Sequence, residues 1–296
     1  MEQEAIDKFK EAGKISAQAL EYGRGLIKKD VLLLEVVDKV EAKIFELGAK
    51  PAFPAQISMN HIAAHYCPNI DDKTVFSDQV VSLDVGAHVD GFIGDNAVTV
   101  DLSGEHENLL NASKEALEEA LKFIKIGVAT GEIGRVIHKT ISDKGFSPVR
   151  NLSGHGLGRY VQHDKPSIPN FDTGDKTKIE KGMVFAVEPF ASTGSGIVQD
   201  SGEASVYMML NKKPVRSLIT RQVLKEIESY EEMPFCRRWL VKKFGAKANF
   251  GLRELQQLDM IKAYPPLVDS NKGLVSQAEH SVLIDDEGQV VVLTKI

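Results

Sequence analysis

Five side chains with the chemistry of metal ligands are spread along the chain between positions 84 and 279. Four are carboxylates and one is an imidazole, and each lies in a strand-like or glycine-rich segment that could aim it at a common point: Asp84, Asp95, His155, Glu188 and Glu279. This oxygen-rich set suits a pair of Mn, Fe(II), Co or Zn ions and differs from the thiolate ligands of structural zinc sites. Two such ions typically activate water for hydrolysis. The sequence therefore predicts a hydrolytic centre with two divalent metal ions.

The composition is that of a globular protein without nucleic-acid or membrane partners. The chain has 296 residues, of which 43% are hydrophobic and 26% charged, so it can bury a substantial core. Its net charge of −6 disfavours phosphate binding. No apolar stretch approaches the length of a membrane span, and the N-terminus lacks the apolar region of a signal peptide. Because the only cysteines, Cys67 and Cys236, lie in dissimilar segments, we expect reduced thiols in a cytoplasmic protein.

An internal repeat organises the first half of the chain. Shifting the sequence by 97 positions aligns residues 16–51 with residues 113–148 without a gap. Apolar residues recur at four-residue spacing in both copies, which indicates amphipathic helices. Gly48 and Gly145 lie where helix-ending glycines belong, each three residues before a proline. Each copy therefore predicts two helices followed by an extended segment. The predicted N-caps of the second helices are Asp30 and Thr130.

Two strand-like runs flank the dipeptide Asp90-Gly91, a strong signal for a two-residue hairpin turn. Such a turn places residue 84 opposite residue 97, so Asp84 and Asp95 become diagonal neighbours on one face of the sheet. In the second copy, Glu188 falls on the position of Asp84 when VFAVEPFA is aligned with VVSLDVGA. We therefore expect Asp84 and Glu188 to face each other across an approximate two-fold axis.

A helical segment separates Glu188 from the next strand-like run, which contains Glu279. Residues 207–263 carry apolar side chains at three- and four-residue spacing and predict a helical subdomain inserted into the second half. Its basic run is predicted to be a solvated helix face and not a nucleic-acid contact: Arg237, Arg238, Lys242 and Lys243. The predicted catalytic domain comprises 1–206 and 264–296, with repeat halves at about 5–105 and 106–296.

Two histidines lie where the repeat would bring them to the metal site from opposite sides. His163 follows the glycine-rich segment around His155, and His65 lies 98 positions earlier, close to the repeat offset. Such a pair suits polarising a carbonyl and protonating a leaving amine. The other histidines have no comparable support, and we interpret them as structural or surface residues: His61, His88, His106, His138 and His280.

Five ordered segments resemble type 2 methionine aminopeptidases, most closely the archaeal form without an N-terminal extension. They are FPAQISMNHIAAHY (53–66), SLDVGAHVDGFIGDNAVTV (82–100), NLSGHGLGRYVQHDKPSIPN (151–170), MVFAVEPFASTGSG (183–196) and YPPLVDSNKGLVSQAEHSVLI (264–284). The helical insert before Tyr264 is typical of type 2 and not of type 1. Two departures affect the pocket. His61 follows Asn60 where an acidic or amide residue is more familiar, and Val206 stands where some relatives carry histidine.

The resemblance implies a pita-bread α/β fold. In this fold two pseudo-symmetric halves share a central antiparallel sheet flanked by helices, and the helical insert is added to them. The resemblance also implies that Asp95 and Glu279 bridge two divalent ions. The ligand set would be completed by Asp84, His155 and Glu188.

The resemblance further implies a methionyl aminopeptidase that removes the initiator methionine from nascent proteins when the second residue is small. Glu188 would shuttle a proton, His163 would stabilise the oxyanion and His65 would contact the scissile amide. Phe53 and Tyr264 would line the methionine pocket. The expected partner is the N-terminal methionine peptide of a nascent chain, with transient ribosome contact and a monomeric state as further expectations.

Two alternatives stay open at this point. Prolidase and aminopeptidase P are related enzymes, but they usually carry an extra N-terminal domain, whereas here the first repeat starts near the N-terminus. A non-catalytic peptide-binding relative of the same fold would typically have lost ligands, and all five are present.

Overall fold

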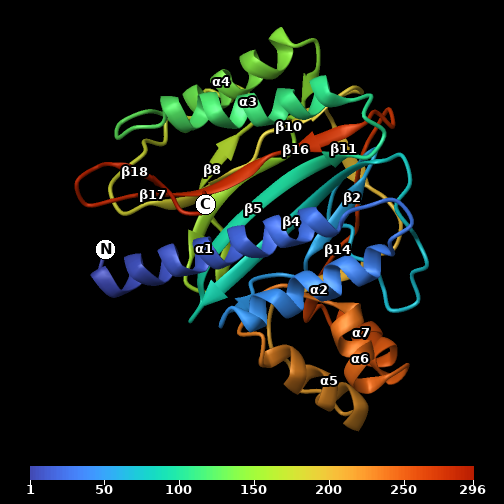
Figure 1. Cartoon of the computed structure of the whole chain (residues 1–296). Helices are drawn as coiled ribbons and strands as arrows, with labels where there is room; N and C mark the ends of the chain where they lie inside the picture. The colour runs from blue at the N-terminus through green and yellow to red at the C-terminus, as the bar shows by residue number, and fades with distance from the viewer.

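The computed structural model describes residues 1–296, and two pairs of helices cover its central sheet (Figure 1). The first pair is α1 (Gln3–Leu26) and α2 (Leu33–Glu46), and the second is α3 (Glu107–Phe123) and α4 (Thr130–Asp143). Each pair packs against the sheet through its own hydrophobic core. This arrangement is the predicted α/β fold with two similar halves.

The helices follow the sequence repeat. α2 and α4 are equally long, and the short strands β1 (Lys50–Pro51) and β6 (Ser147–Pro148) follow them at the same offset. Gly48 and Gly145 lie two residues before these strands with φ angles of 91° and 83°. Glycine adopts this left-handed conformation without the steric cost that a side chain would add. The two copies of the repeat thus fold into equivalent units.

The predicted N-caps of α2 and α4 are wrong. Asp30 lies three residues before the start of α2, in a turn with φ of 68°, and Thr130 is itself the first residue of α4. A neighbouring segment satisfies the first amide of each helix. The N–H of Leu33 donates to the carbonyl of Thr74, and the N–H of Thr130 donates to the carbonyl of Thr177. A backbone partner therefore replaces the side-chain cap at both positions.

A nine-stranded antiparallel sheet forms the centre of the molecule. Besides β1, its strands are β2 (Gln56–Met59), β4 (Val80–Val89), β5 (Phe92–Asp101), β7 (Ser153–Gly158), β8 (Val161–Pro169), β9 (Val184–Val187), β17 (Glu279–Ile284) and β18 (Val290–Val292). The order across the sheet is β1, β4, β5, β17, β9, β7 and β8, with β2 also beside β4 and β18 also beside β17. Strands from both halves therefore meet where β5 pairs with β17.

The hairpin of β4 and β5 has the predicted turn and register. Asp90 and Gly91 form its two-residue turn with φ angles of 49° and 88°, as a type I′ turn requires. Asp84 pairs with Ala97, and Asp95 lies opposite Gly86 on the neighbouring strand. The diagonal arrangement of the two aspartates is thereby confirmed.

Alternation along the strands directs apolar side chains to the helices and carboxylates to the opposite face. On β4, Leu83 and Val85 belong to the core beneath α1 and α2, and Asp84 lies between them in sequence. On β17, Val282 and Ile284 belong to the core beneath α3 and α4, whereas Glu279 has the opposite parity. The side of the sheet away from the helices therefore receives the acidic residues.

Two smaller sheets support this open face. One contains β6, β10 (Phe190–Ser192) and β16 (Val275–Gln277), and the other contains β3 (Ile62–Ala64), β11 (Val198–Asp200) and β15 (Leu267–Asp269). The first of these sheets joins distant segments within the second half, whereas the second sheet pairs β3 of the first half with β15 of the second half and thereby ties the two halves together.

The segment between β11 and β15 folds around a core of its own. It contains β12 (Val206–Met209), α5 (Leu218–Glu228), β13 (Phe235–Cys236), α6 (Arg237–Phe244), α7 (Lys247–Gln257) and β14 (Ile261–Tyr264). β12 pairs with both β13 and β14, which brings the two ends of the segment together. Figure 1 shows its helices below α2.

One residue of the predicted solvated helix face is buried. Arg238 is 1% exposed, and its guanidinium forms ion pairs with Glu41 at 2.6 Å and with Asp38 at 2.5 Å, both on α2. It also donates a hydrogen bond to the carbonyl of Pro68. The prediction is wrong here because two carboxylates that are distant in sequence compensate the buried charge.

None of the helices combines the length and the apolar character that a membrane span requires.

Candidate metal centre

Neighbouring strands place the five predicted ligands side by side. In the order of the sheet, Asp84 lies on β4, Asp95 on β5, Glu279 at the start of β17, Glu188 directly after β9 and His155 on β7. Asp84 and Glu279 pair with the same residue of β5, Ala97, from its two sides. The sheet therefore gathers residues from almost 200 positions of sequence into one row.

The acidic side chains and the imidazole approach one another closely. Ligand atoms of Asp95, His155 and Glu279 all lie within 4.8 Å of one another. His155 Nε2 lies 3.8 Å from Asp95 Oδ2 and 3.7 Å from Glu188 Oε1. These separations leave room for a cation between the groups.

The electrostatics of this cluster demand a compensating positive charge. Burial raises the pKa of Asp84 to about 7. Burial and the neighbouring carboxylates raise the pKa of Asp95, Glu188 and Glu279 well above their usual values. Burial lowers the pKa of His155 to about 4, so its imidazole is neutral at pH 7. No lysine or arginine lines the cavity that contains these five residues.

Two oxygen atoms of the cluster have no partner within the protein. Asp84 Oδ1 and Asp95 Oδ1 are buried without a hydrogen bond. Buried carboxylate oxygens are costly unless a donor or a metal ion satisfies them. Hard oxygen ligands with one neutral imidazole fit Mn, Fe(II), Co or Zn. The residues present therefore suit divalent metal ions.

Residues that the sequence analysis missed hold the ligands in place. Gln277 is buried and donates from Nε2 to Glu279 Oε2 at 3.4 Å. Ser281 accepts a hydrogen bond from the N–H of Asp95 and donates to its carbonyl, which locks β5 against β17. Both lie two residues from Glu279 on the same face, so strand alternation could have identified them.

The two predicted histidines lie in the same cavity as the acidic cluster. The ring centroid of His163 is 4.4 Å from that of His155. Burial and the proximity of His155 lower the pKa of His163 to about 3, and burial lowers the pKa of His65. Both imidazoles are therefore neutral near pH 7 and can each donate one hydrogen bond.

His65 has an unusual backbone that a glutamine stabilises. Its φ is 68°, a left-handed conformation that is rare for residues with a side chain. Its N–H donates to Gln56 Oε1 at 2.7 Å, and its Nδ1 lies 3.3 Å from the carbonyl oxygen of Pro265. Gln56 pairs across the strands with Asp84. Gln56 thus positions His65 through a strand pairing that the sequence alone does not indicate.

All the predicted site residues line one cavity of about 100 Å³. They are Phe53, His65, Asp84, Asp95, His155, His163, Glu188, Tyr264 and Glu279. Its apolar side adds Phe190, Val206 and Pro234, of which only Val206 entered the sequence analysis. Val206 and Tyr264 pair where the helical segment leaves and rejoins the chain, and Pro234 within that segment supplies part of the wall.

Comparison with known proteins identifies the relatives of this chain. A sequence profile of metallopeptidase family M24 matches residues 7–217. A methionine aminopeptidase of Archaeoglobus fulgidus is 45% identical over 293 residues, which is 98% of this chain and 99% of the relative. The chain belongs to the methionine aminopeptidases of metallopeptidase family M24. It is therefore a metallo-exopeptidase, as the sequence predicted.

Two further relatives agree with this assignment. A methionine aminopeptidase of Methanocaldococcus jannaschii is 42% identical over the full length of both chains. The crystal structure of a methionine aminopeptidase from Thermotoga maritima is 26% identical, with a TM-score of 0.74, covering 100% of this chain and 98% of that one. The predicted family and fold are thus confirmed. Family membership and the Asp-His-Glu cluster together support divalent metal binding.

Proposed function

We propose that the protein removes the N-terminal methionine from newly made polypeptides whose second residue is small, using two divalent metal ions. The observation that supports this most is the row of four carboxylates and one histidine, of which Asp95, Glu279 and His155 are buried, beside two neutral histidines and an apolar wall. Such a site combines ligands for the ions, donors for a carbonyl and a slot for an apolar side chain.

The metal ligands in this proposal are the five clustered residues. Together they would hold both ions, since they lie side by side on neighbouring strands: Asp84, Asp95, Glu279, Glu188 and His155. The ions, when bound, lower the pKa of water and polarise a carbonyl oxygen. Cobalt, manganese, iron(II) and zinc all suit this set of ligands.

Three residues of the chain would move or hold protons. The Glu188 carboxylate lies beside His155 at the edge of the cluster, so it can accept a proton from water and deliver it to the nitrogen of the leaving amine. His163 would donate a hydrogen bond to the carbonyl oxygen as negative charge develops there. His65, whose ring proton is directed from Nδ1 to the carbonyl of Pro265, would accept a hydrogen bond at Nε2 from the scissile amide group.

The apolar wall would bind the methionine side chain. Phe53 and Tyr264 line the cavity together with Val206, and a thioether packs well against aromatic rings. The α-amine of the substrate would lie beside the carboxylates, which favours a free N-terminus. The second residue would then lie against the metal centre and His65, where a large side chain would clash.

We also propose that residues 207–263 form an insert subdomain on a catalytic domain made of residues 1–206 and 264–296. The separate core of this segment supports the division. The proposed substrate is the N-terminus of a nascent chain, which is made in the cytoplasm, and we expect the enzyme to act there as a monomer with transient contact to the ribosome.

Competing peptides test the proposed specificity. We expect kcat/KM for Met-Ala-Ser to exceed that for Met-Leu-Ser by far more than about 200-fold. Loss of attraction for one methylene group explains only about 1–3 kcal/mol, which is about 10- to 200-fold. Exclusion by steric clash has no such limit. N-acetylated Met-Ala-Ser is the control for the free amine and should not be cleaved. Comparable values for the first two peptides would contradict the proposal and indicate a broader aminopeptidase.

A further inference from the structure

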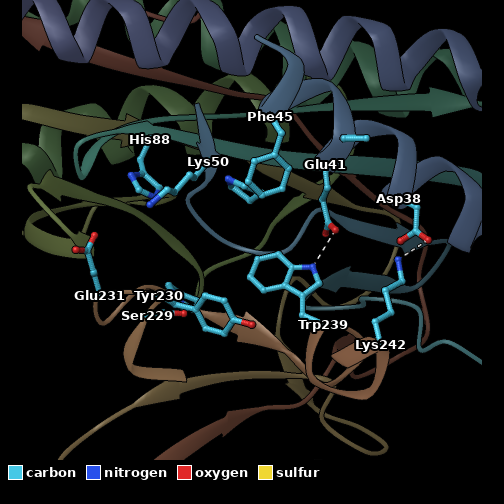
Figure 2. A pocket seen from close by; sticks show the side chains of 13 residues that line it. Asp38, Glu41, Phe45, Lys50, His88, Ser229, Tyr230, Glu231, Trp239 and Lys242 are labelled. Carbon is cyan, nitrogen blue, oxygen red and sulfur yellow. Dashed lines mark hydrogen bonds and ion pairs between the residues drawn. The ribbon is translucent and has the colours of Figure 1, made fainter. Parts of the chain in front are cut away.

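A second and larger cavity lies between α2 and the insert subdomain. Its volume is about 580 Å³, within the range typical of small-molecule sites. Figure 2 shows that α2 and β1 form one wall, and that α6 and the loop after α5 form the other. It shares only Pro234 with the catalytic cavity, so the two are separate spaces with one residue in common.

One end of this cavity is aromatic. Phe45, which is 60% exposed, lies across from Tyr230 and Trp239 (Figure 2). The rings of Tyr230 and Trp239 meet edge to face at 5.4 Å. Trp239 Nε1 donates to Glu41 at 2.8 Å, so the polar atom of the indole is already satisfied. These rings can therefore pack against an apolar group of a ligand.

The other end offers unpaired polar groups. His88 is 7% exposed, and its Nδ1 accepts a hydrogen bond from the N–H of Gly91 at 3.0 Å. The ring proton therefore lies on Nε2, which has no partner in the protein. Lys50 forms no ion pair, and Figure 2 shows it beside His88. This end thus presents one ammonium group and one neutral N–H donor.

A carboxylate completes this end of the cavity. Glu231 lies across from His88 (Figure 2) and belongs to the loop that joins α5 to β13. It has a φ of 54°, and Glu232 follows with 72°. Two consecutive left-handed residues with side chains are costly unless the surroundings fix them. Burial of Met233 in the core around Phe53 anchors the loop and thereby holds Glu231 in place.

We propose that this cavity binds a free α-amino acid with an apolar or aromatic side chain. The ligand carboxylate would accept hydrogen bonds from Lys50 and from His88 Nε2, and its ammonium group would donate to Glu231. The side chain would extend toward Tyr230 and Trp239. These charges match a zwitterion, whereas a simple anion would face Glu231 and a simple cation would face Lys50. The inference rests on the cavity alone, although methionine, the product of the proposed reaction, belongs to this class.

Trp239 makes the proposal directly testable because it is the only tryptophan of the chain. Metal-free protein is titrated with L-methionine and L-phenylalanine while tryptophan fluorescence is recorded, and calorimetry checks the affinity. N-acetyl-L-methionine and L-methioninamide each lack one charge of the zwitterion. The variants are Lys50→Met and Glu231→Gln, and the matched control is Lys139→Met on the surface of α4, far from the cavity.

We expect a saturable fluorescence change with both amino acids. Lys50→Met, Glu231→Gln and both blocked ligands should each weaken binding by about tenfold or more, the usual effect of losing one charge-assisted hydrogen bond. Lys139→Met should bind like the unaltered protein. Absence of saturable binding, or binding that both cavity variants leave unchanged, would overturn the proposal, since the second result would place the ligand in the catalytic cavity. Because no turnover is measured, failure of this test is distinct from failure of the proposed enzyme function.

Discussion

Buried carboxylates in a shared cavity are unstable neighbours unless a cation balances them. Asp95 and Glu279 are each 2% exposed and close to one another, and no basic side chain lines their cavity. Folding alone would not favour such a cluster. Metal binding would offset the free-energy cost of burying these carboxylates together, because each carboxylate would then be attracted to a cation.

The histidines beside the cluster lead to a prediction for catalysis. His163→Asn should lower kcat by about 10²–10³, the usual effect of removing one donor to a developing oxyanion. Metal content should stay unchanged because His163 is not among the proposed ligands. His138→Asn on α4 is the control and should retain full activity. A loss below about fivefold for His163→Asn, in steady-state assays with Met-Ala-Ser, would show that its role is misassigned.

The raised carboxylate pKa values predict that metal binding releases protons. In the metal-free protein Asp84 has a pKa of about 7, so it is largely protonated at pH 6 and must lose its proton to bind a metal ion. His155, with a pKa of about 4, is already neutral and contributes none. Apparent metal affinity should therefore rise with pH between 6 and 7. Calorimetry in buffers of different ionisation enthalpy should detect about one proton or more released per chain at pH 6. Metal binding without proton release would contradict the assignment of Asp84 as a ligand.

At the scale of elements, the insert subdomain is attached to α2 through a buried ion network. Arg238 on α6 pairs with Glu41 and Asp38, and Lys242 on the same helix also pairs with Asp38 at 2.7 Å. The network borders the catalytic cavity, since Arg238 contacts Cys67, which packs with Val206 of the cavity wall. The ion network that attaches the insert therefore also supports the wall of the proposed methionine pocket.

This network predicts a large and specific loss of stability. Arg238→Met leaves Glu41 buried without its partner and should lower the free energy of unfolding by about 3–5 kcal/mol. Lys242→Met removes an exposed partner and should cost only about 0–1 kcal/mol. The double variant Arg238→Met with Glu41→Leu should regain part of the loss. Urea unfolding followed by Trp239 fluorescence measures all three, and equal losses for the two single variants would refute the buried network.

For the whole molecule, local patterns made much of the fold and site predictable. The Asp90-Gly91 turn fixes the register of its own hairpin, and the paired glycines mark the helix ends of the repeat. The contact of Arg238 with Glu41 could not be predicted because it joins residues 197 positions apart. The helix caps failed for the same reason, since distant backbone carbonyls replace them.

The catalytic cavity requires the complete molecule. Asp84 comes from the first half, His155 from the second and Pro234 from the insert, and they line one space. No single half or subdomain therefore contains the full site, and sequence reasoning could name its members but not the cavity they enclose.

Release of methionine from Met-Ala-Ser by protein stripped of metal, and then titrated with manganese or cobalt, tests the central claim most directly. Without metal we expect no release, because no other group in the cavity lowers the pKa of water to near neutrality. Activity should return on titration and saturate at about two equivalents per chain. Full turnover by protein whose metal content is confirmed as nil would contradict the account.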